Sequence, residues 1–336
     1  MTKRISLVVA MCFFSVQDVR AQDSYFTDTN PDVVRYEVAE DVVYGTGMVL
    51  KGGKKIAKPL TMDVYSPKAD KGADRPSVVL VYGGAHHRGN PRVKYVGFGS
   101  QTSSMSDYAM RFAEEGYVAF TIRYRVAPDN PVLSTFDGFS EESLDTKFLE
   151  DPEAIRQANV IRAQMGLEPL TAETSVPILK AAIIAGAEDL RAAIRHIKAE
   201  AKEYGVAPDK VALMGFSAGA VTAINVAYGM QEPVAAVVAN SGYPSVFNME
   251  RLVKKDSKVP PALLFMAQND YPVVEMELPP FMKLLTSMGL EYEFSWIPSH
   301  GHFYPSGVTT LGNDGSKMSL EARGLKFLRQ TFNPSR

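Results

Sequence analysis

A serine at position 217 stands in the pattern G-F-S-A-G, residues 215–219. The apolar run Lys210–Phe216 predicts a short strand, and the run Ala218–Tyr228 predicts a buried helix directly after the serine. A hydroxyl on so sharp a turn projects away from the sheet, and small neighbours let the helix pack close behind the strained residue. The context favours a nucleophile, although the bare pentapeptide also occurs as a turn without chemistry.

A serine is a poor nucleophile unless a base accepts its proton and an acid orients that base. The chain has five histidines as candidate bases: His86, His87, His196, His300 and His302. His196 lies within a helical pattern, which favours a packing or solvated role. His86 and His87 lack carboxylate or thiol companions at ligand spacing, so no metal site is expected. The chemistry requires no metal and no organic cofactor.

Strands and helices alternate along the rest of the chain. Apolar or alternating runs predict strands at Val42–Leu50, Pro59–Tyr65, Ser77–Tyr82, 118–124, 210–216, 234–240, 261–267 and 291–297. Helical patterns cover 105–117, Ala181–Tyr204, Ala218–Tyr228, 279–290 and 318–332. This order predicts an α/β protein with a mainly parallel sheet and helices on both faces. We expect residues 22–336 to form one catalytic domain.

One segment, about residues 131–179, breaks this alternation. It is too long for a structureless loop, and residues 151–166 carry a helix start and a glycine stop, so we expect an insertion with short helices. It follows a strand whose carboxyl end should face the ligand crevice, which places it over the active site as a lid. Its aromatic side chains Phe136, Phe139 and Phe148 would line an acyl pocket or pack a small core. A peripheral segment without a binding role is the alternative.

Together the segments "VYGGAHHRG", "YRVAP", "GFSAG", "NDYPVV" and "HGHF" resemble the α/β-hydrolase superfamily. Within it they are most similar to esterases related to hormone-sensitive lipase and to the acetylxylan and feruloyl esterases. The resemblance runs from about Lys58 to the C-terminus. It implies an eight-stranded, mainly parallel sheet and a serine hydrolase activity.

In this superfamily the nucleophile is followed along the chain by the acid and then by the histidine. That order implies Ser217 as nucleophile and Asp270, at the end of the apolar run 261–267, as acid. Glu275 and Glu277 are alternative acids that lie further from the strand end.

The same order limits the base to His300 or His302. Related enzymes usually place the histidine four residues after a proline, with glycine before it, and counting from Pro298 reaches His302. We prefer His302 and keep His300 as the alternative.

The family's H-G-G-G oxyanion motif corresponds here to residues 82–89. Tyr82 and His86 depart from the motif, and Ala85 replaces the third glycine. Backbone N–H groups form such a hole, so the resemblance implies that Gly83, Gly84 and Ala218 donate to the oxyanion. We expect these departures from the motif to affect which substrates fit the site more than they affect the reaction.

Composition and charge limit the classes of partner that the protein is expected to bind. The 336-residue chain is 46% apolar and 22% charged, with a net charge of −2 at neutral pH. No block of lysine and arginine indicates binding to nucleic acid or to an anionic membrane.

The first 21 residues have the features of a signal peptide. Lys3 and Arg4 precede an apolar run, Ile5–Val16, that is too short for a permanent membrane span. A small-residue site predicts cleavage after Ala21 and a secreted or periplasmic protein. The only cysteine, Cys12, would leave with the peptide, so the mature protein would have no disulfide.

These residues predict a secreted serine esterase that acts through an acyl-enzyme on small-molecule or polysaccharide esters, such as acetyl or feruloyl esters. An amidase or peptidase of the same fold is an alternative. A catalytically inactive hydrolase that serves as a binding protein is another.

Overall fold

The computed structural model describes residues 35–68, 74–134 and 140–333. The predicted signal peptide, residues 1–21, lies outside the described residues, as do Phe136 and Phe139. No helix in the described ranges is long and apolar enough to cross a membrane.

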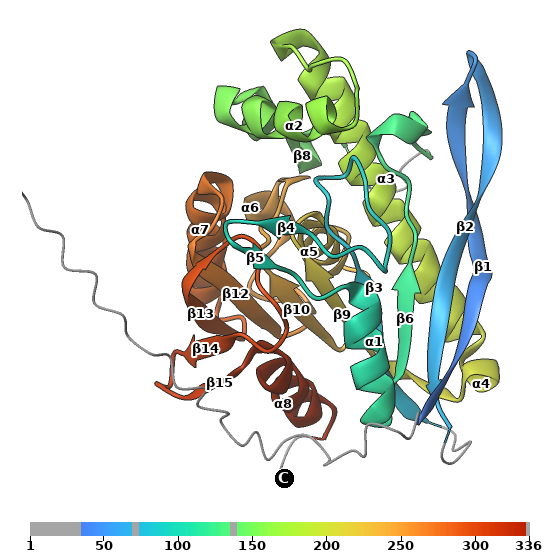
Figure 1. Ribbon diagram of the computed structural model, residues 1–336, viewed down its shortest axis with the longest axis vertical. Coiled ribbons are helices and arrows are strands. Elements are labelled where there is room, and N and C mark those ends of the chain that lie inside the picture. Colours follow the sequence, from blue (N-terminus) through green and yellow to red (C-terminus); the bar gives the residue numbers. More distant parts are fainter. Residues whose placement is uncertain (1–34, 69–73, 135–139, 334–336) are drawn as a thin grey trace, which may run out of the picture.

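An 11-stranded sheet forms the centre of the molecule, in the order β15-β14-β13-β12-β10-β9-β3-β6-β2-β1-β7 (Figure 1). Its eight main strands are β1 (Tyr36–Lys51), β2 (Lys54–Pro67), β3 (Arg75–Val81), β6 (Val118–Ile122), β9 (Val206–Phe216), β10 (Ala236–Asn240), β12 (Ala262–Asn269) and β13 (Tyr292–Gly301). The six strands from β6 to β13 are parallel, whereas β1 and β2 add in antiparallel fashion. This confirms the predicted mainly parallel sheet.

Three short strands extend the sheet at its edges: β7 (Pro131–Val132), β14 (Thr309–Gly312) and β15 (Lys317–Ser319). Four more short strands form two separate pairs: β4 (Val96–Gly97) with β5 (Ser100–Gln101), and β8 (Leu144–Asp145) with β11 (Val246–Phe247).

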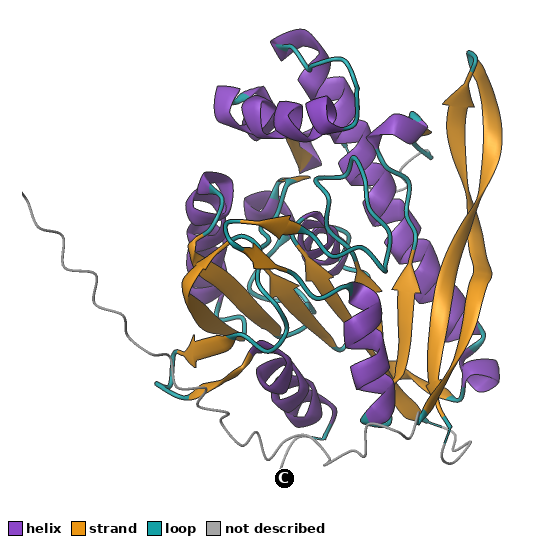
Figure 2. Cartoon of the chain, viewed as in Figure 1, coloured by secondary structure: helices purple, strands orange, loops and turns teal. Residues whose placement is uncertain are grey.

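Helices cover both faces of the sheet (Figure 2). In Figure 1, α1 (Met105–Glu114) and α8 (Leu320–Phe332) lie on the near side, and α3 (Ala172–Ala199) and α5 (Ala218–Ile224) lie on the far side. The remaining helices are α2 (Pro152–Gln164), α4 (Ala201–Tyr204), α6 (Met249–Leu252) and α7 (Pro272–Met288), with single turns at Ala127–Asp129, Glu141–Ser143, Lys147–Glu150 and Asn225–Gly229. The central strands are buried under both layers, and all five residues of β10 are buried. Burial on both faces explains their continuous apolar sequence.

Two helices begin earlier than the sequence predicted. The long helix α3 starts at Ala172 rather than at 181, because Thr171 caps it by accepting from the Thr174 N–H. Pro177 lies inside α3, where it removes one helical hydrogen bond, and the buried apolar face of α3 outweighs that loss. Helix α7 begins at Pro272 rather than at 279, since a proline at the first helical position gives up no hydrogen bond.

Two predicted ends were also wrong. The helix after the serine leaves α geometry at Ile224 and finishes as a π-helical turn, Asn225–Gly229. The strand predicted as the last, 291–297, continues to Gly301 and is followed by β14 and β15. These two short strands lack an apolar run, so periodicity did not reveal them.

The predicted insertion forms short elements and the helix α2, which lies above the carboxyl ends of the parallel strands (Figure 1). Its final residues, 172–179, belong to α3 instead, so the insertion is shorter than predicted. A small apolar cluster joins the insertion to α3 and β11: Leu149, Ala158, Leu170, Leu179, Ile183, Ile184 and Val246. Phe148 packs against this cluster and against the ring of Tyr243, which supports the small-core interpretation for this residue.

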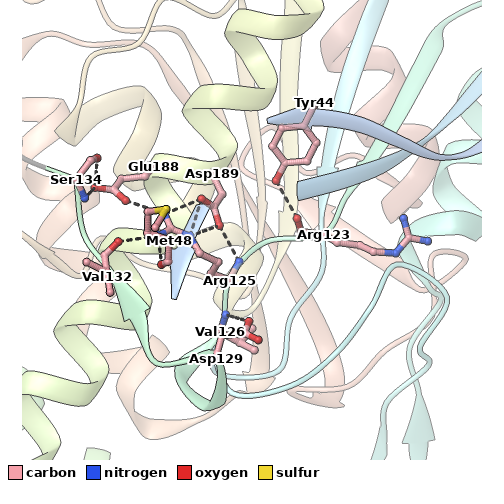
Figure 3. A network of polar contacts seen from close by, with 10 residues as sticks. All are labelled: Tyr44, Met48, Arg123, Arg125, Val126, Asp129, Val132, Ser134, Glu188 and Asp189. Atoms are coloured by element: carbon pink, nitrogen blue, oxygen red, sulfur yellow. Dashed lines mark hydrogen bonds and ion pairs between the residues drawn. The ribbon is translucent and has the colours of Figure 1, made fainter. Parts of the chain in front are cut away.

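A buried ion-pair network fastens the base of the insertion to the sheet (Figure 3). Arg125, just after β6, donates to both carboxylate oxygens of Asp189 and to Glu188, both on α3. Its guanidinium also donates to the carbonyls of Met48 in β1 and Val132 in β7. A buried guanidinium needs this full set of acceptors, because an unpaired buried charge is strongly destabilising. The "YRVAP" segment therefore has a structural role.

Candidate active site

Ser217 lies at the turn between β9 and α5, at the carboxyl end of a central strand. Its backbone has φ 54° and ψ −122°, a conformation that costs a non-glycine residue on the order of 1–3 kcal/mol. Its N–H donates to the Asn240 carbonyl in β10 (2.9 Å), and its carbonyl accepts from the Val221 N–H (3.0 Å). The neighbouring strand and helix therefore hold the strained turn.

The two glycines beside the serine are required by close packing. A Cβ at Gly215 would lie 2.3 Å from the Gly219 backbone, and a Cβ at Gly219 would lie 2.0 Å from the Val81 carbonyl oxygen. Any side chain there would push α5 away from β3 and β9. The sequence prediction of a tightly packed serine turn agrees with this geometry.

The structure brings the three predicted catalytic side chains into one hydrogen-bonded chain. His302 Nε2 lies 2.8 Å from Ser217 Oγ, and His302 Nδ1 lies 2.5 Å from Asp270 Oδ1. Asp270 follows β12 and His302 follows β13, so the ends of three parallel strands supply the site. The histidine and aspartate side chains are almost fully buried, whereas Ser217 is partly exposed.

Four donors surround the Asp270 carboxylate. Oδ1 accepts from His302 and from the Tyr271 N–H (2.9 Å), while Oδ2 accepts from Ser241 Oγ (2.5 Å) and the Ala267 N–H (3.0 Å). Burial alone would raise the pKa of Asp270, but His302 and these hydrogen bonds outweigh it and hold the pKa below its ordinary value. The ionised carboxylate thus fixes His302 Nδ1 as a donor and leaves Nε2 free to accept a proton from the serine.

Aromatic rings hold the imidazole from several sides. The Tyr271 ring centroid lies 4.2 Å from that of His302, and the rings of Phe216 and Phe303 lie at 5.1 and 5.3 Å. The Tyr304 ring contacts that of Phe216, and its hydroxyl lies 2.6 Å from Ser241 Oγ. This packing restricts rotation of the base.

The loop after β3 passes directly beside the serine. A Cβ at Gly83 would lie 3.1 Å from Ser217 Cβ, and a Cβ at Gly84 would lie 2.0 Å from the Arg88 carbonyl oxygen. Tyr95 donates its hydroxyl proton to the Gly83 carbonyl (2.8 Å), which fixes the peptide plane that carries the Gly84 N–H. Ala218 is the first residue of α5, where an N–H has no intrahelical acceptor. These N–H groups can receive a developing oxyanion, as the sequence implied.

His86 and His87 hold the oxyanion loop in shape. His86 Nε2 lies 3.0 Å from Thr222 Oγ1, whose proton goes to the Ala218 carbonyl, so the imidazole donates to the threonine. Burial, with a smaller contribution from the neighbouring His87, lowers the pKa of His86 to about 3, so the ring stays neutral. Ala85, which replaces the third glycine of the family motif, and the next residue, His86, both have positive φ, at 54° and 56°.

The remaining candidates lie outside the triad. His300 Nδ1 contacts the Pro298 carbonyl (2.9 Å), and His196 Nε2 contacts Tyr204 Oη (3.0 Å). Glu275 and Glu277 lie on α7, and neither is hydrogen-bonded to His302 within the described residues. His302 and Asp270 therefore form the hydrogen-bonded chain with Ser217, whereas His300 and both glutamates lie outside it.

Sequence reasoning missed the supporting residues Ser241, Tyr271 and Tyr95. Ser241 follows β10 directly, and a polar residue at the end of a buried strand beside the serine turn was the available signal. No signal in the sequence pointed to Tyr95, because its role depends on how the loop folds back over Gly83.

Comparisons with known proteins bear on the family and the fold. The BD-FAE family matches residues 178–251, which include Ser217 and Ser241 but neither Asp270 nor His302. The comparison with curated proteins gave no match.

Three solved structures share the fold at low sequence identity. A truncated carbohydrate esterase from gut microbiota is 16% identical, with a TM-score of 0.52, and the alignment covers 89% of this chain and 98% of that one. Esterase 2 of the planctomycete Thermogutta terrifontis is 17% identical at a TM-score of 0.50, covering 88% of this chain and 91% of that one. Esterase B of Lactobacillus rhamnosis is 15% identical, with a TM-score of 0.50, and the alignment covers 89% of this chain and 85% of that one.

Strand order, the serine turn and these likenesses agree with one another. The chain therefore has the α/β-hydrolase fold, with a BD-FAE match across the segment that carries its serine turn.

Proposed function

We propose that this protein is a serine esterase that hydrolyses carboxylic esters through an acyl-enzyme. The hydrogen-bonded chain from Ser217 through His302 to Asp270, built on a strained turn, carries the proposal. A catalytically inactive binding protein would have no need of this strained turn or of a buried imidazole aimed at the serine.

In the first half-reaction, Ser217 Oγ attacks the ester carbonyl carbon while its proton passes to His302 Nε2. The N–H groups of Gly84 and Ala218 stabilise the oxyanion, assisted by Gly83, and loss of one such donor typically costs about 10²–10³ in rate. His302 then gives the proton to the leaving alcohol as the carbon–oxygen bond breaks, and the acyl group remains on the serine.

In the second half-reaction, water takes the place of the alcohol. His302 Nε2 removes a proton from the water, the resulting oxygen attacks the acyl carbon, and the proton returns to Ser217 Oγ as the carboxylic acid leaves. Asp270 stays ionised throughout and stabilises the imidazolium that forms twice in each turnover.

The proposed substrates are acyl esters on polysaccharide, such as acetyl or feruloyl esters. Two observations support this class: the predicted export of the chain, and the fold shared with a solved carbohydrate esterase.

The decisive test is covalent labelling with a fluorophosphonate, since only an activated serine reacts quickly with this probe. We expect stoichiometric labelling, with the phosphonyl group found on the peptide that contains Ser217. Prior denaturation should abolish the labelling. Labelling no faster than that of the denatured chain would favour the inactive binding protein instead.

We also propose that the protein is exported and that its mature chain begins at Gln22. The basic start and short apolar run of residues 1–21 motivate this proposal. N-terminal sequencing of protein from the culture medium or periplasm is expected to begin at Gln22, and a chain that keeps Met1 would contradict it.

A further inference from the structure

Two arginines beside the oxyanion loop have no carboxylate partner within the described residues. Arg88 belongs to the loop itself, and Arg162 lies on α2 of the insertion. Most other arginines of the described chain form ion pairs, as Arg125 does with Asp189 and Arg156 does with Glu153. Arg88 and Arg162 thus belong to the minority of described arginines without a carboxylate partner.

Arg88 is attached to the oxyanion loop by its main chain. Its N–H donates to the Gly84 carbonyl (3.3 Å), and its own carbonyl oxygen lies against the Gly84 Cα. The Nε atom of Arg88 is buried and has no hydrogen-bond partner in the described structure, although the residue as a whole is partly exposed. A buried N–H donor without an acceptor costs free energy, so this atom requires an explanation.

The charge of Arg88 reaches two aromatic residues of the active site. Burial raises the pKa of Tyr95 and of Tyr271, and the positive charge of Arg88 partly opposes the rise at both phenols. Tyr95 holds the Gly83 carbonyl, and the Tyr271 ring packs on His302. The charge of Arg88 thus acts on two phenols, one bonded to the oxyanion loop and one stacked on His302.

Arg162 reaches the same loop from the insertion. Its Nη1 lies 3.2 Å from His87 Nε2, and its Nε donates to the Glu168 carbonyl (2.6 Å). His87 Nδ1 donates to the Ala85 carbonyl (2.8 Å), which leaves Nε2 as an acceptor for Arg162. Burial lowers the pKa of His87, and the charges of Arg162 and Arg88 lower it further against the opposing Ala85 hydrogen bond. Both guanidiniums thus lie close to this neutral ring.

We propose that Arg88 and Arg162 bind a carboxylate group of the ester substrate beside the oxyanion loop. A guanidinium presents a planar fork of donors that matches a carboxylate, and a charged hydrogen bond is stronger than a neutral one. The natural substrates would then be acidic esters, such as an acylated uronic acid or the ester of a dicarboxylic acid. This inference rests on the proposed esterase function and adds the substrate class.

The test compares esters that differ only in charge. 4-Nitrophenyl adipate, with one free carboxylate, is paired with 4-nitrophenyl hexanoate for the acyl half. 4-Acetoxybenzoate is paired with 4-acetoxybenzamide for the alcohol half. The readout is the ratio of kcat/KM for the anionic member to that for the neutral member of each pair.

The wild type is expected to favour the anionic member of at least one pair. In the double variant Arg88→Gln/Arg162→Gln that ratio should fall at least about tenfold, the loss expected for one charged hydrogen bond. The wild-type ratio should also fall as salt is added, because screening weakens the attraction between charges near the surface. Arg156→Gln, on the same helix but paired with Glu153, is the matched control and should leave the ratio unchanged.

Equal ratios in the wild type and the double variant would overturn the inference. An equal loss on both members of a pair would do the same, because it would mean that the arginines only support the oxyanion loop.

Binding without turnover separates this inference from the esterase proposal. Calorimetry on Ser217→Ala protein is expected to detect binding of adipate or 4-hydroxybenzoate. Adding Arg88→Gln and Arg162→Gln to that protein should abolish this binding. Binding that survives those substitutions, or no binding at all, counts against the carboxylate site. Failure of the wild type to hydrolyse any of the four esters counts against the esterase function alone.

Discussion

Ser217→Ala is expected to lower kcat for ester hydrolysis by on the order of 10⁶, the loss seen when the nucleophile of a comparable triad is removed. Alanine offers no oxygen for the acyl group, so neither half-reaction of the proposed cycle can proceed. The substitution keeps the φ of 54° at the turn and the N–H contact with Asn240, so the thermal unfolding midpoint should change little.

The measurement is a 4-nitrophenyl acetate assay on protein whose circular dichroism matches the wild type. Ser287→Ala, an exposed serine on α7, is the matched control and should retain full activity. Activity of folded Ser217→Ala within tenfold of the wild type would remove Ser217 as the nucleophile.

Asp270→Asn is expected to lower kcat by about 10⁴, because the change disrupts the tautomer of the base. All four contacts of the carboxylate come from donors, two of them the fixed backbone N–H groups of Ala267 and Tyr271. An asparagine must therefore turn its own NH₂ group toward one pair of donors. If the NH₂ faces His302, Nδ1 must accept, the proton moves to Nε2, and the imidazole can no longer take a proton from Ser217.

The same substitution should change the acid limb of the stability curve. Since the pKa of Asp270 is lowered in the folded protein, its ionised form stabilises the fold above the unfolded-state pKa. That stabilisation is lost as pH falls through the lowered pKa, and the asparagine variant should lack this dependence. Urea unfolding from pH 3 to 7 measures the effect.

Glu275→Gln is the control for the alternative acid. Its side chain is exposed on α7, and we expect kcat to stay within about twofold of the wild type, as for most exposed substitutions. A large loss in Glu275→Gln, with activity preserved in Asp270→Asn, would reverse the assignment.

The resemblance implied the order serine, acid, histidine, and the ends of predicted strands then pointed to Ser217 and Asp270, which the structure joins to His302 by hydrogen bonds. Ser217, Asp270 and His302 come directly after β9, β12 and β13, and carboxyl ends of parallel strands meet at one edge. Apolar runs identify such strands, so the active-site edge can be located without coordinates.

Contacts between distant loops could not be predicted in this way. The Tyr95 contact with Gly83 and the Arg162 contact with His87 depend on how irregular segments fold over the sheet. Neither periodicity nor turn chemistry specifies such paths. The helix starts at Ala172 and Pro272 were also missed, and in both helices a proline, Pro177 or Pro279, lies inside the helix that packing stabilises.

The distance along the chain between Ser217 and His302, 85 residues, bears on when activity arises during synthesis. The serine turn, with β3, β6, β9 and β10 around it, is complete in sequence well before the ribosome adds the residues of β12 and β13. A nascent chain therefore carries an unactivated serine until its last parallel strand has docked beside β12. In the proposed mechanism, hydrolysis therefore requires the chain from β12 onward to have folded, and a protease cut that released His302 would abolish it.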